Sequence, residues 1–141
     1  MRDYRKIEAW RLGDDLTVSL YELSRVFPKE EVYGLTSQLR RAAYSVPANI
    51  AEGSSRESKR DYLRFLYIAR GSLSEAQYFI HLARRLGYAS NTESERLEAQ
   101  ARQAFACLHG LIQSVEREAG PLAKTAATLS SLFVLYFSRP G

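Results

Sequence analysis

The sequence predicts an all-α fold, an antiparallel up-down bundle of four helices, and three observations carry this prediction. Apolar residues recur at intervals of three and four in four long segments, which is the period of one helix face. None of these segments shows the sustained alternation of a half-buried strand. Glycine and proline stand mostly at the breaks between the segments, and the short connections there favour antiparallel neighbours.

The first two predicted helices are each marked by a proline. Pro28 ends the first apolar row, whereas Pro47 stands inside the second. A proline lacks the backbone N–H, and its ring clashes with the carbonyl four residues earlier, here that of Ala43. We therefore expect a kinked second helix, bent between Ala43 and Pro47. The two apolar rows are Ala9, Leu12, Leu16, Leu20, Leu23 and Phe27, and then Leu35, Leu39, Ala42, Ala43, Val46 and Ile50.

The third and fourth predicted helices carry signals at their ends. Ser54 and Glu57 form an S-x-x-E capping box before the third helix, and Gly87 follows its last turn. Thr92 and Glu95 are expected to cap the fourth. The two apolar rows are Tyr62, Phe65, Leu66, Ala69, Leu73, Ala76, Ile80 and Ala83, and then Leu97, Ala101, Ala104, Leu108, Leu111 and Val115.

The third helix is also small, aromatic or apolar on the side opposite its core row. A helix that is apolar on both sides is normally buried on both sides, and one bundle of this size covers only one of them. We therefore expect a second subunit there, in a closed ring or dimer. The alternative is that its tyrosines lie along the surface with wet hydroxyl groups. The predicted subunit face consists of Tyr67, Gly71, Ser74, Tyr78 and Leu82.

Length and composition indicate one soluble domain. The chain has 141 residues, 45% hydrophobic and 26% charged, and a single cysteine, Cys107, so no disulfide forms within it. No secretory signal and no long uncharged span is present, which favours a reducing cytoplasm. We divide the chain into a bundle, 1–119, and a C-terminal appendage, 120–141, whose order the sequence leaves open. Its apolar run 132–137 is too short to cross a bilayer.

Residues for catalysis or cofactor binding are scarce. His81 and His109 have no carboxylate or cysteine three or four residues away, so no metal site is predicted. No phosphate-binding loop or dinucleotide motif occurs, and no cofactor is expected. Glu52 and Glu75 are the candidates for a partly buried carboxylate that acts as an acid or base. The sequence as a whole predicts a protein that is not an enzyme.

The basic residues point to a nucleic-acid ligand. Between Gly34 and Ser72 seven arginines and lysines face three acidic residues, a local excess of +4 that equals the +4 of the whole chain. Guanidinium groups bind phosphates in a bidentate way, so this clustering favours a phosphate backbone. A solvated face of paired charges is the alternative, and Arg40 has a second candidate role, pairing with Glu52 or Glu75. The predicted binding residues are Arg40, Arg41, Arg56, Lys59, Arg60 and Arg64.

Four strings of residues, 27–31, 34–43, 45–53 and 62–75, resemble a known family. These strings, from FPKEE through GLTSQLRRAA and SVPANIAEG to YLRFLYIARGSLSE, are similar to the four-helix-bundle proteins encoded in intervening sequences of bacterial 23S rRNA genes. That family is also called the S23 ribosomal protein family. The resemblance runs from about Tyr4 to Glu118 and leaves the appendage without a counterpart.

The resemblance implies a homo-oligomeric ring, pentameric in known members, and association with RNA. A related branch, the accessory proteins of diversity-generating retroelements, implies a reverse transcriptase as a second partner. The family has no assigned catalytic residues, so none is transferred to this chain. Three functions stay open: binding of structured RNA or a nucleoprotein, service to a retroelement polymerase, and a purely structural oligomer without nucleic acid.

Overall fold

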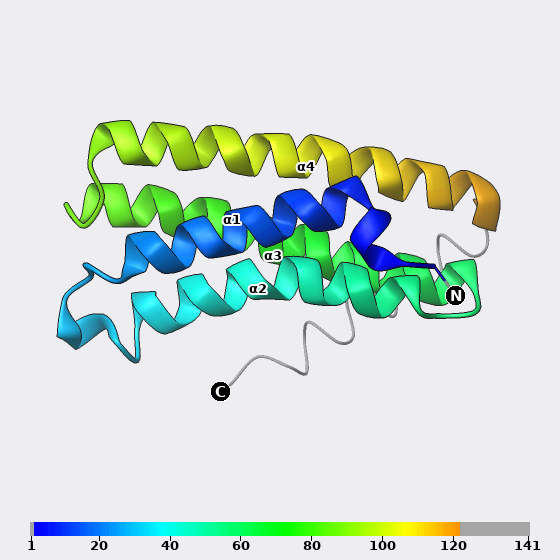
Figure 1. Cartoon of the computed structure of the whole chain (residues 1–141), viewed down its shortest axis with the longest axis horizontal. Helices are drawn as coiled ribbons and strands as arrows, with labels where there is room; N and C mark the ends of the chain where they lie inside the picture. The colour runs from blue at the N-terminus through cyan, green and yellow to red at the C-terminus, as the bar shows by residue number, and fades with distance from the viewer. Residues whose placement is uncertain (1, 122–141) are drawn as a thin grey trace.

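Four helices make up residues 2–121, the part of the chain that the computed structural model describes (Figure 1). The backbone of α1 lies next to those of α2 and α4, and so does that of α3, while the backbones of the diagonal pairs are further apart. No strand occurs between residues 2 and 121, so the predicted all-α fold with four helices is confirmed. The helices are α1 (Glu8–Ser24), α2 (Leu35–Ser54), α3 (Lys59–Arg85) and α4 (Asn91–Ala119), with 3₁₀ turns η1 (Tyr4–Lys6) and η2 (Lys29–Glu31).

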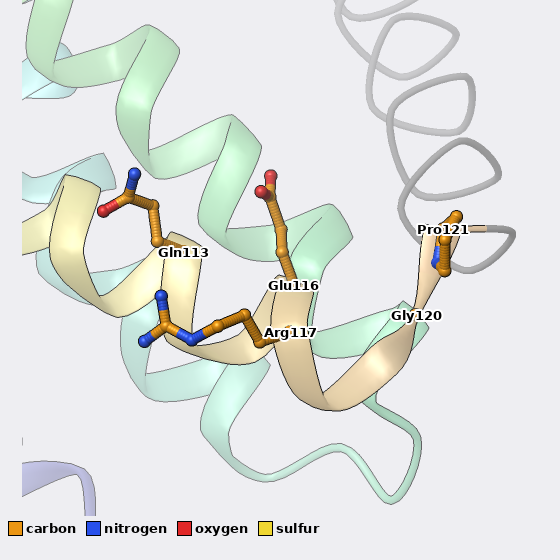
Figure 2. A pocket seen from close by; sticks show the side chains of 5 residues that line it. All are labelled: Gln113, Glu116, Arg117, Gly120 and Pro121. Carbon is orange, nitrogen blue, oxygen red and sulfur yellow. The ribbon is translucent and has the colours of Figure 1, made fainter.

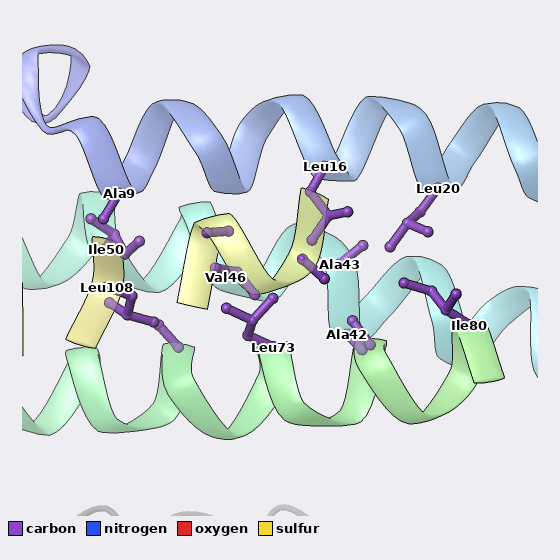
Figure 3. Packing of buried hydrophobic residues seen from close by; sticks show 14 of the residues in the cluster. Ala9, Leu16, Leu20, Ala42, Ala43, Val46, Ile50, Leu73, Ile80 and Leu108 are labelled. Carbon is purple, nitrogen blue, oxygen red and sulfur yellow. The ribbon is translucent and has the colours of Figure 1, made fainter. Parts of the chain in front are cut away.

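The core lies along the axis between the four helices. The apolar rows of the four helices point inward, as Figure 3 shows for α1, α2 and α3 around Leu16, Val46 and Leu73. Phe65 is the exception: it is buried but lies outside the core cluster, under two arginines. Leu63 and Ile112 are also fully buried, although neither belongs to the apolar rows predicted from the sequence. The largest fully buried side chains are Tyr62, Leu16, Leu20, Leu39, Ile50, Leu63, Leu66, Leu73, Ile80, Leu97, Leu108 and Ile112.

Pro47 lies within α2, which is helical from one end to the other. The missing N–H of Pro47 leaves the Ala43 carbonyl without its partner in the helix. Thr17 on α1 supplies a donor, because its hydroxyl lies 3.0 Å from the Ala43 oxygen and 2.8 Å from the Gly13 oxygen. A Cβ at Gly13 would lie 3.1 Å from Cγ1 of Val46, so the absence of a side chain lets α1 approach α2 here.

The start of α3 differs from the sequence prediction. Ser54 is the last residue of α2, is buried, and donates its hydroxyl to the Ala51 carbonyl. The cap is Ser58, whose hydroxyl accepts from the backbone N–H of Asp61. The capping box of Ser54 with Glu57 is therefore wrong, because α2 continues about one turn further than the motif suggested.

Of the two caps predicted for the connection from α3 to α4, the structure confirms only the one at the end of α3. Gly87 has a φ of +78°, and the N–H groups of Gly87 and Tyr88 bond back to the last turn of α3, which confirms the predicted glycine. The predicted Thr92 cap is wrong, because Ser90 has the extended backbone and forms the capping box with Glu93.

Candidate nucleic-acid interface

The six predicted basic residues fall into two groups. Arg40 and Arg41 lie near the start of α2, while the other four surround the connection between α2 and α3. The stretch of α2 from Arg41 to Ser54 is about 20 Å long at 1.5 Å per residue. The six residues therefore do not form one continuous patch.

In the first group, Arg40 is held by α1. Its Nε donates to the hydroxyl of Ser24 at 2.8 Å, and its guanidinium lies 4.8 Å from the centre of the Tyr21 ring. The predicted pairing of Arg40 with Glu52 or Glu75 is therefore wrong. The side chain is directed toward α1, because one residue along a helix turns the direction by about 100° relative to Arg41.

Arg41 takes the contact that was expected of its neighbour. Its Nη2 lies 3.2 Å from Oε2 of Glu75 on α3. The Ser45 and Ser72 hydroxyls, 2.8 Å apart, form a second polar link between the same two helices. Arg41 thus belongs to the seam between α2 and α3, and half of its side chain is exposed.

In the second group, Phe65 holds two arginines. The guanidinium groups of Arg56 and Arg64 lie 4.8 and 4.3 Å from the centre of its ring. Arg56 also pairs with Glu52 at 2.7 Å, and Arg64 with Asp61 at 3.6 Å. Stacking against one ring restricts both guanidinium groups, while their edges remain available for polar contacts.

Lys59 and Arg60 open α3 beside these arginines. Lys59 Nζ lies 2.6 Å from Oε2 of Glu118 on α4, and its hydrogen bond holds the pKa of that carboxyl below its usual range. Arg60 is exposed and forms no ion pair within residues 2–121. Arg60 is the basic residue here with the least competition for its charge.

Arg2 joins this group from the other end of the sequence. Its Nη1 donates to the carbonyls of Ser54 and Arg56, both at 3.3 Å, and its guanidinium lies 4.9 Å from the centre of the Tyr62 ring. Sequence reasoning missed Arg2, because nothing local relates it to residues more than 50 positions away. A pocket of about 530 Å³ lies here, lined by Arg2, Ser54, Ser55, Arg56 and Glu57.

We call this group the basic turn. Its basic residues are interspersed with the carboxylates of Glu52, Glu57, Asp61 and Glu118. Five positive charges thus face four negative ones. The basic turn consists of Arg2, Arg56, Lys59, Arg60 and Arg64.

The predicted subunit face on α3 is partly reassigned. Tyr67 is only 6% exposed, and its hydroxyl donates to Oε1 of Glu116 on α4 at 2.6 Å, so it packs within this chain. Figure 2 shows Glu116 directed toward α3, in a pocket of about 470 Å³ at the end of α4. Gly71, Ser74 and Tyr78 lie on the outward side, Tyr78 with 55% of its surface exposed, while Leu82 is partly buried and also packs against the core. We call them the α3 stripe: Gly71, Ser74, Tyr78 and Leu82.

The side chains considered for metal or acid–base chemistry have the following surroundings. Within 2–121, no three histidine, cysteine, aspartate or glutamate side chains lie together in a way that holds a metal ion. Glu52 and Glu75 are largely exposed and ion-paired, not buried. Cys107 packs against the core, and burial raises the pKa of its thiol. Across residues 2–121, none of the helices has the length and apolar character needed to cross a membrane.

Comparison with known proteins decides the family. Residues 5–110 match the family model described as 23S rRNA-intervening sequence protein. The chain belongs to this family. A protein with unknown function from the S23 ribosomal protein family of Bacteroides thetaiotaomicron has a similar crystal structure, with a TM-score of 0.68 and 21% identity over 74% of this chain and 97% of that chain. That similarity supports the four-helix fold. No curated protein matches the chain.

Proposed function

We propose that this up-down bundle is a non-enzymatic binding protein that assembles into a homo-oligomeric ring and binds structured RNA or a nucleoprotein. The basic turn is the proposed contact, and the α3 stripe the proposed subunit face. One observation carries the proposal: two arginines stack on Phe65 beside Arg60, which has no ion-pair partner within residues 2–121. Membership of a family named for 23S rRNA supports RNA as the ligand.

Phosphate groups can replace the carboxylates that now contact the basic turn. Exposed ion pairs are worth at most about 1 kcal/mol each, and the partners Glu52 and Glu118 have about half of their side chains exposed. A guanidinium binds a phosphate through two parallel hydrogen bonds, and the Phe65 ring already restricts two of the guanidinium planes. The contacts are mainly to the RNA backbone, so affinity depends steeply on salt and weakly on sequence.

The near balance of charge makes one basic turn a weak site. A ring presents the same turn once per subunit, and simultaneous contacts raise the apparent affinity without any new interaction. We propose five subunits, as the family resemblance implies. Gly71→Glu places bulk and charge on the α3 stripe and should reduce the mass to that of one chain in light scattering. An unchanged mass for the folded variant would place the subunit face elsewhere.

The nucleic-acid contact is tested by two matched charge reversals. Arg60→Glu with Arg64→Glu alters the basic turn, whereas Arg40→Glu with Arg41→Glu makes the same change in charge about 20 Å away along α2. The first pair should lower affinity for a structured RNA hairpin at least tenfold and flatten its salt dependence, while the second should have a much smaller effect. If both double variants lose the same affinity for the hairpin, the RNA is attracted by the net charge of the protein and not by the basic turn.

The structural-oligomer alternative is favoured by one observation. Arg41, Arg56, Lys59 and Arg64 each have a carboxylate partner within the chain, as in a solvated, charge-balanced face. Crosslinking in native cells followed by sequencing separates the two functions. RNA recovery no greater than that of a charge-matched control would favour the structural oligomer. Copurification of a reverse transcriptase would instead favour the retroelement function.

A further inference from the structure

The α3 stripe contains a glycine that the described residues do not explain. Gly71 lies in the middle of a 27-residue helix, where glycine costs about 1 kcal/mol relative to alanine. A Cβ at this position would meet no other atom within 4 Å. Of the charged neighbours, Glu75 is paired with Arg41, and the guanidinium of Arg70 lies 4.9 Å from the centre of the Tyr67 ring. The stripe is suited to an apolar neighbour that approaches the backbone closely.

The described part of the chain ends beside the start of α3, about 18 Å along that helix from Gly71. Two contacts bind the end of α4 to the first half of α3, Lys59 with Glu118 and Tyr67 with Glu116. α4 then ends at Ala119, and Gly120 redirects the chain with a φ of +81° (Figure 2). A segment after Pro121 that docks on the stripe therefore has to run about 18 Å along α3 to reach Gly71.

The sequence after Pro121 matches the stripe in length and chemistry. Twenty residues follow in this sequence, and none between Thr125 and Ser138 is charged. Twenty residues span about 30 Å as a helix, and the distance along α3 from Lys59 to Tyr78 is about 29 Å. One helical row of this segment is apolar throughout: Leu122, Ala126, Leu129, Phe133 and Tyr136.

We propose that the segment 122–141 docks along the α3 stripe of its own subunit. The apolar row covers Gly71 and Tyr78, and the missing side chain at Gly71 gives the row its closest approach. The short tether from Pro121 gives the segment a millimolar effective concentration, well above that of a second subunit in dilute solution. The docked segment thus competes with assembly of the ring; this consequence rests on the proposed function, whereas the docking itself does not.

Thiol labelling of the full chain tests the docking. The reporter is Gly71→Cys in a Cys107→Ser background, and the matched control is Gly110→Cys on α4, where a Cβ likewise meets nothing within 4 Å. The thiol at position 71 should react with a maleimide at least tenfold more slowly than the thiol at 110. Leu129→Asp with Phe133→Asp should remove this protection, whereas Thr128→Asp with Ser131→Asp, off the apolar row, should leave it unchanged.

Three results would overturn the docking: equal reactivity at 71 and 110, protection that survives Leu129→Asp with Phe133→Asp, or protection that falls on dilution. The last two would show that a second copy covers the stripe, which supports the proposed ring. Helicity by circular dichroism verifies folding, and Ser74→Cys is a second reporter on the same exposed face. If Leu129→Asp with Phe133→Asp removes the protection but light scattering still gives the mass of one chain, the docking is supported and the proposed subunit face is wrong.

Discussion

Glycines stand in two kinds of place within these helices, and the contrast separates the inside of the bundle from its outer face. At Gly13 on α1 and Gly53 on α2, a Cβ would press on neighbouring side chains, at 3.1 Å from Val46 and at 2.8 Å from Phe65. At Gly71 on α3 and Gly110 on α4, a Cβ would meet nothing within 4 Å. The inner glycines are explained by helix packing within one chain, and the outer two are not.

The comparison shows where function is to be sought. Inside the bundle, small residues and apolar rows account for each other, so the residues there serve the fold. On the outer face of α3, a costly glycine meets nothing within residues 2–121, and Tyr78 is exposed with ring contacts only to Phe79 and His81 there. The predictions below measure this difference, from the largest expected effect to the smallest.

Leu73→Ala should cause the largest loss. Leu73 is fully buried, so truncation removes apolar contacts and leaves a cavity that costs about 2–5 kcal/mol in the free energy of unfolding. Leu82→Ala on the outer side of the same helix is the control and should cost far less. Urea denaturation of both variants gives the two values. Equal losses would mean that Leu82 is as deeply buried as Leu73 in the assembled protein.

Gly53→Ala should destabilise the chain although it improves helix propensity. The new methyl group would lie 2.8 Å from Cβ of Phe65 and 3.0 Å from Cδ2 of Tyr62, so α2 and α3 must separate. Crowding of this kind costs about 1–3 kcal/mol, more than the gain of up to about 1 kcal/mol from replacing glycine. Thermal unfolding measures the balance. A rise in Tm would show that the turn relaxes without cost.

Thr17→Val tests the contact beside Pro47. Valine has the shape of threonine but no hydroxyl, so the Ala43 carbonyl loses the donor that replaces the missing N–H of Pro47. An unsatisfied buried carbonyl costs about 1–3 kcal/mol. Thr17→Ser keeps the hydroxyl and should retain most of the stability. If both variants unfold at the same denaturant concentration, water or a shift of α2 satisfies the carbonyl instead.

The inner side of the molecule was largely predictable from the sequence, because helical periodicity is a local property. The rows through Leu16, Leu39, Leu73 and Leu108 all face the core as expected. The caps were not predictable, since several serines and threonines stand near each helix start and tertiary packing selects one. Gly53 fits against Phe65 and Tyr62, and α2 therefore continues to Ser54, the residue that was expected to cap α3.

The candidate site was predictable only in part, because its contacts join distant segments. Arg56 and Arg64 were identified as basic, but their shared contact with Phe65 depends on the turn between α2 and α3. Arg2 had no signal at all. Tyr67 lies at the edge of the outward side of α3, where periodicity does not distinguish solvent from a contact with α4. The sequence thus identified charge and periodicity, and the fold decided the partners.

Gly71→Ala and Gly110→Ala should give the smallest effects on the free energy of unfolding, and they compare the two outer glycines directly. Replacing an exposed glycine within a helix by alanine stabilises a protein by about 0.5–1 kcal/mol when the new methyl group meets no obstacle. Gly110→Ala should give this gain in urea denaturation of the full chain. Gly71→Ala should give less than half of it, because the methyl group enters the contact with the segment or subunit that covers the α3 stripe. Equal gains would show that nothing approaches the backbone at Gly71, and both proposals for this face would lose their main support. A smaller gain at 71 that becomes equal to that at 110 once Leu129→Asp and Phe133→Asp are added would identify the segment 122–141 as the neighbour.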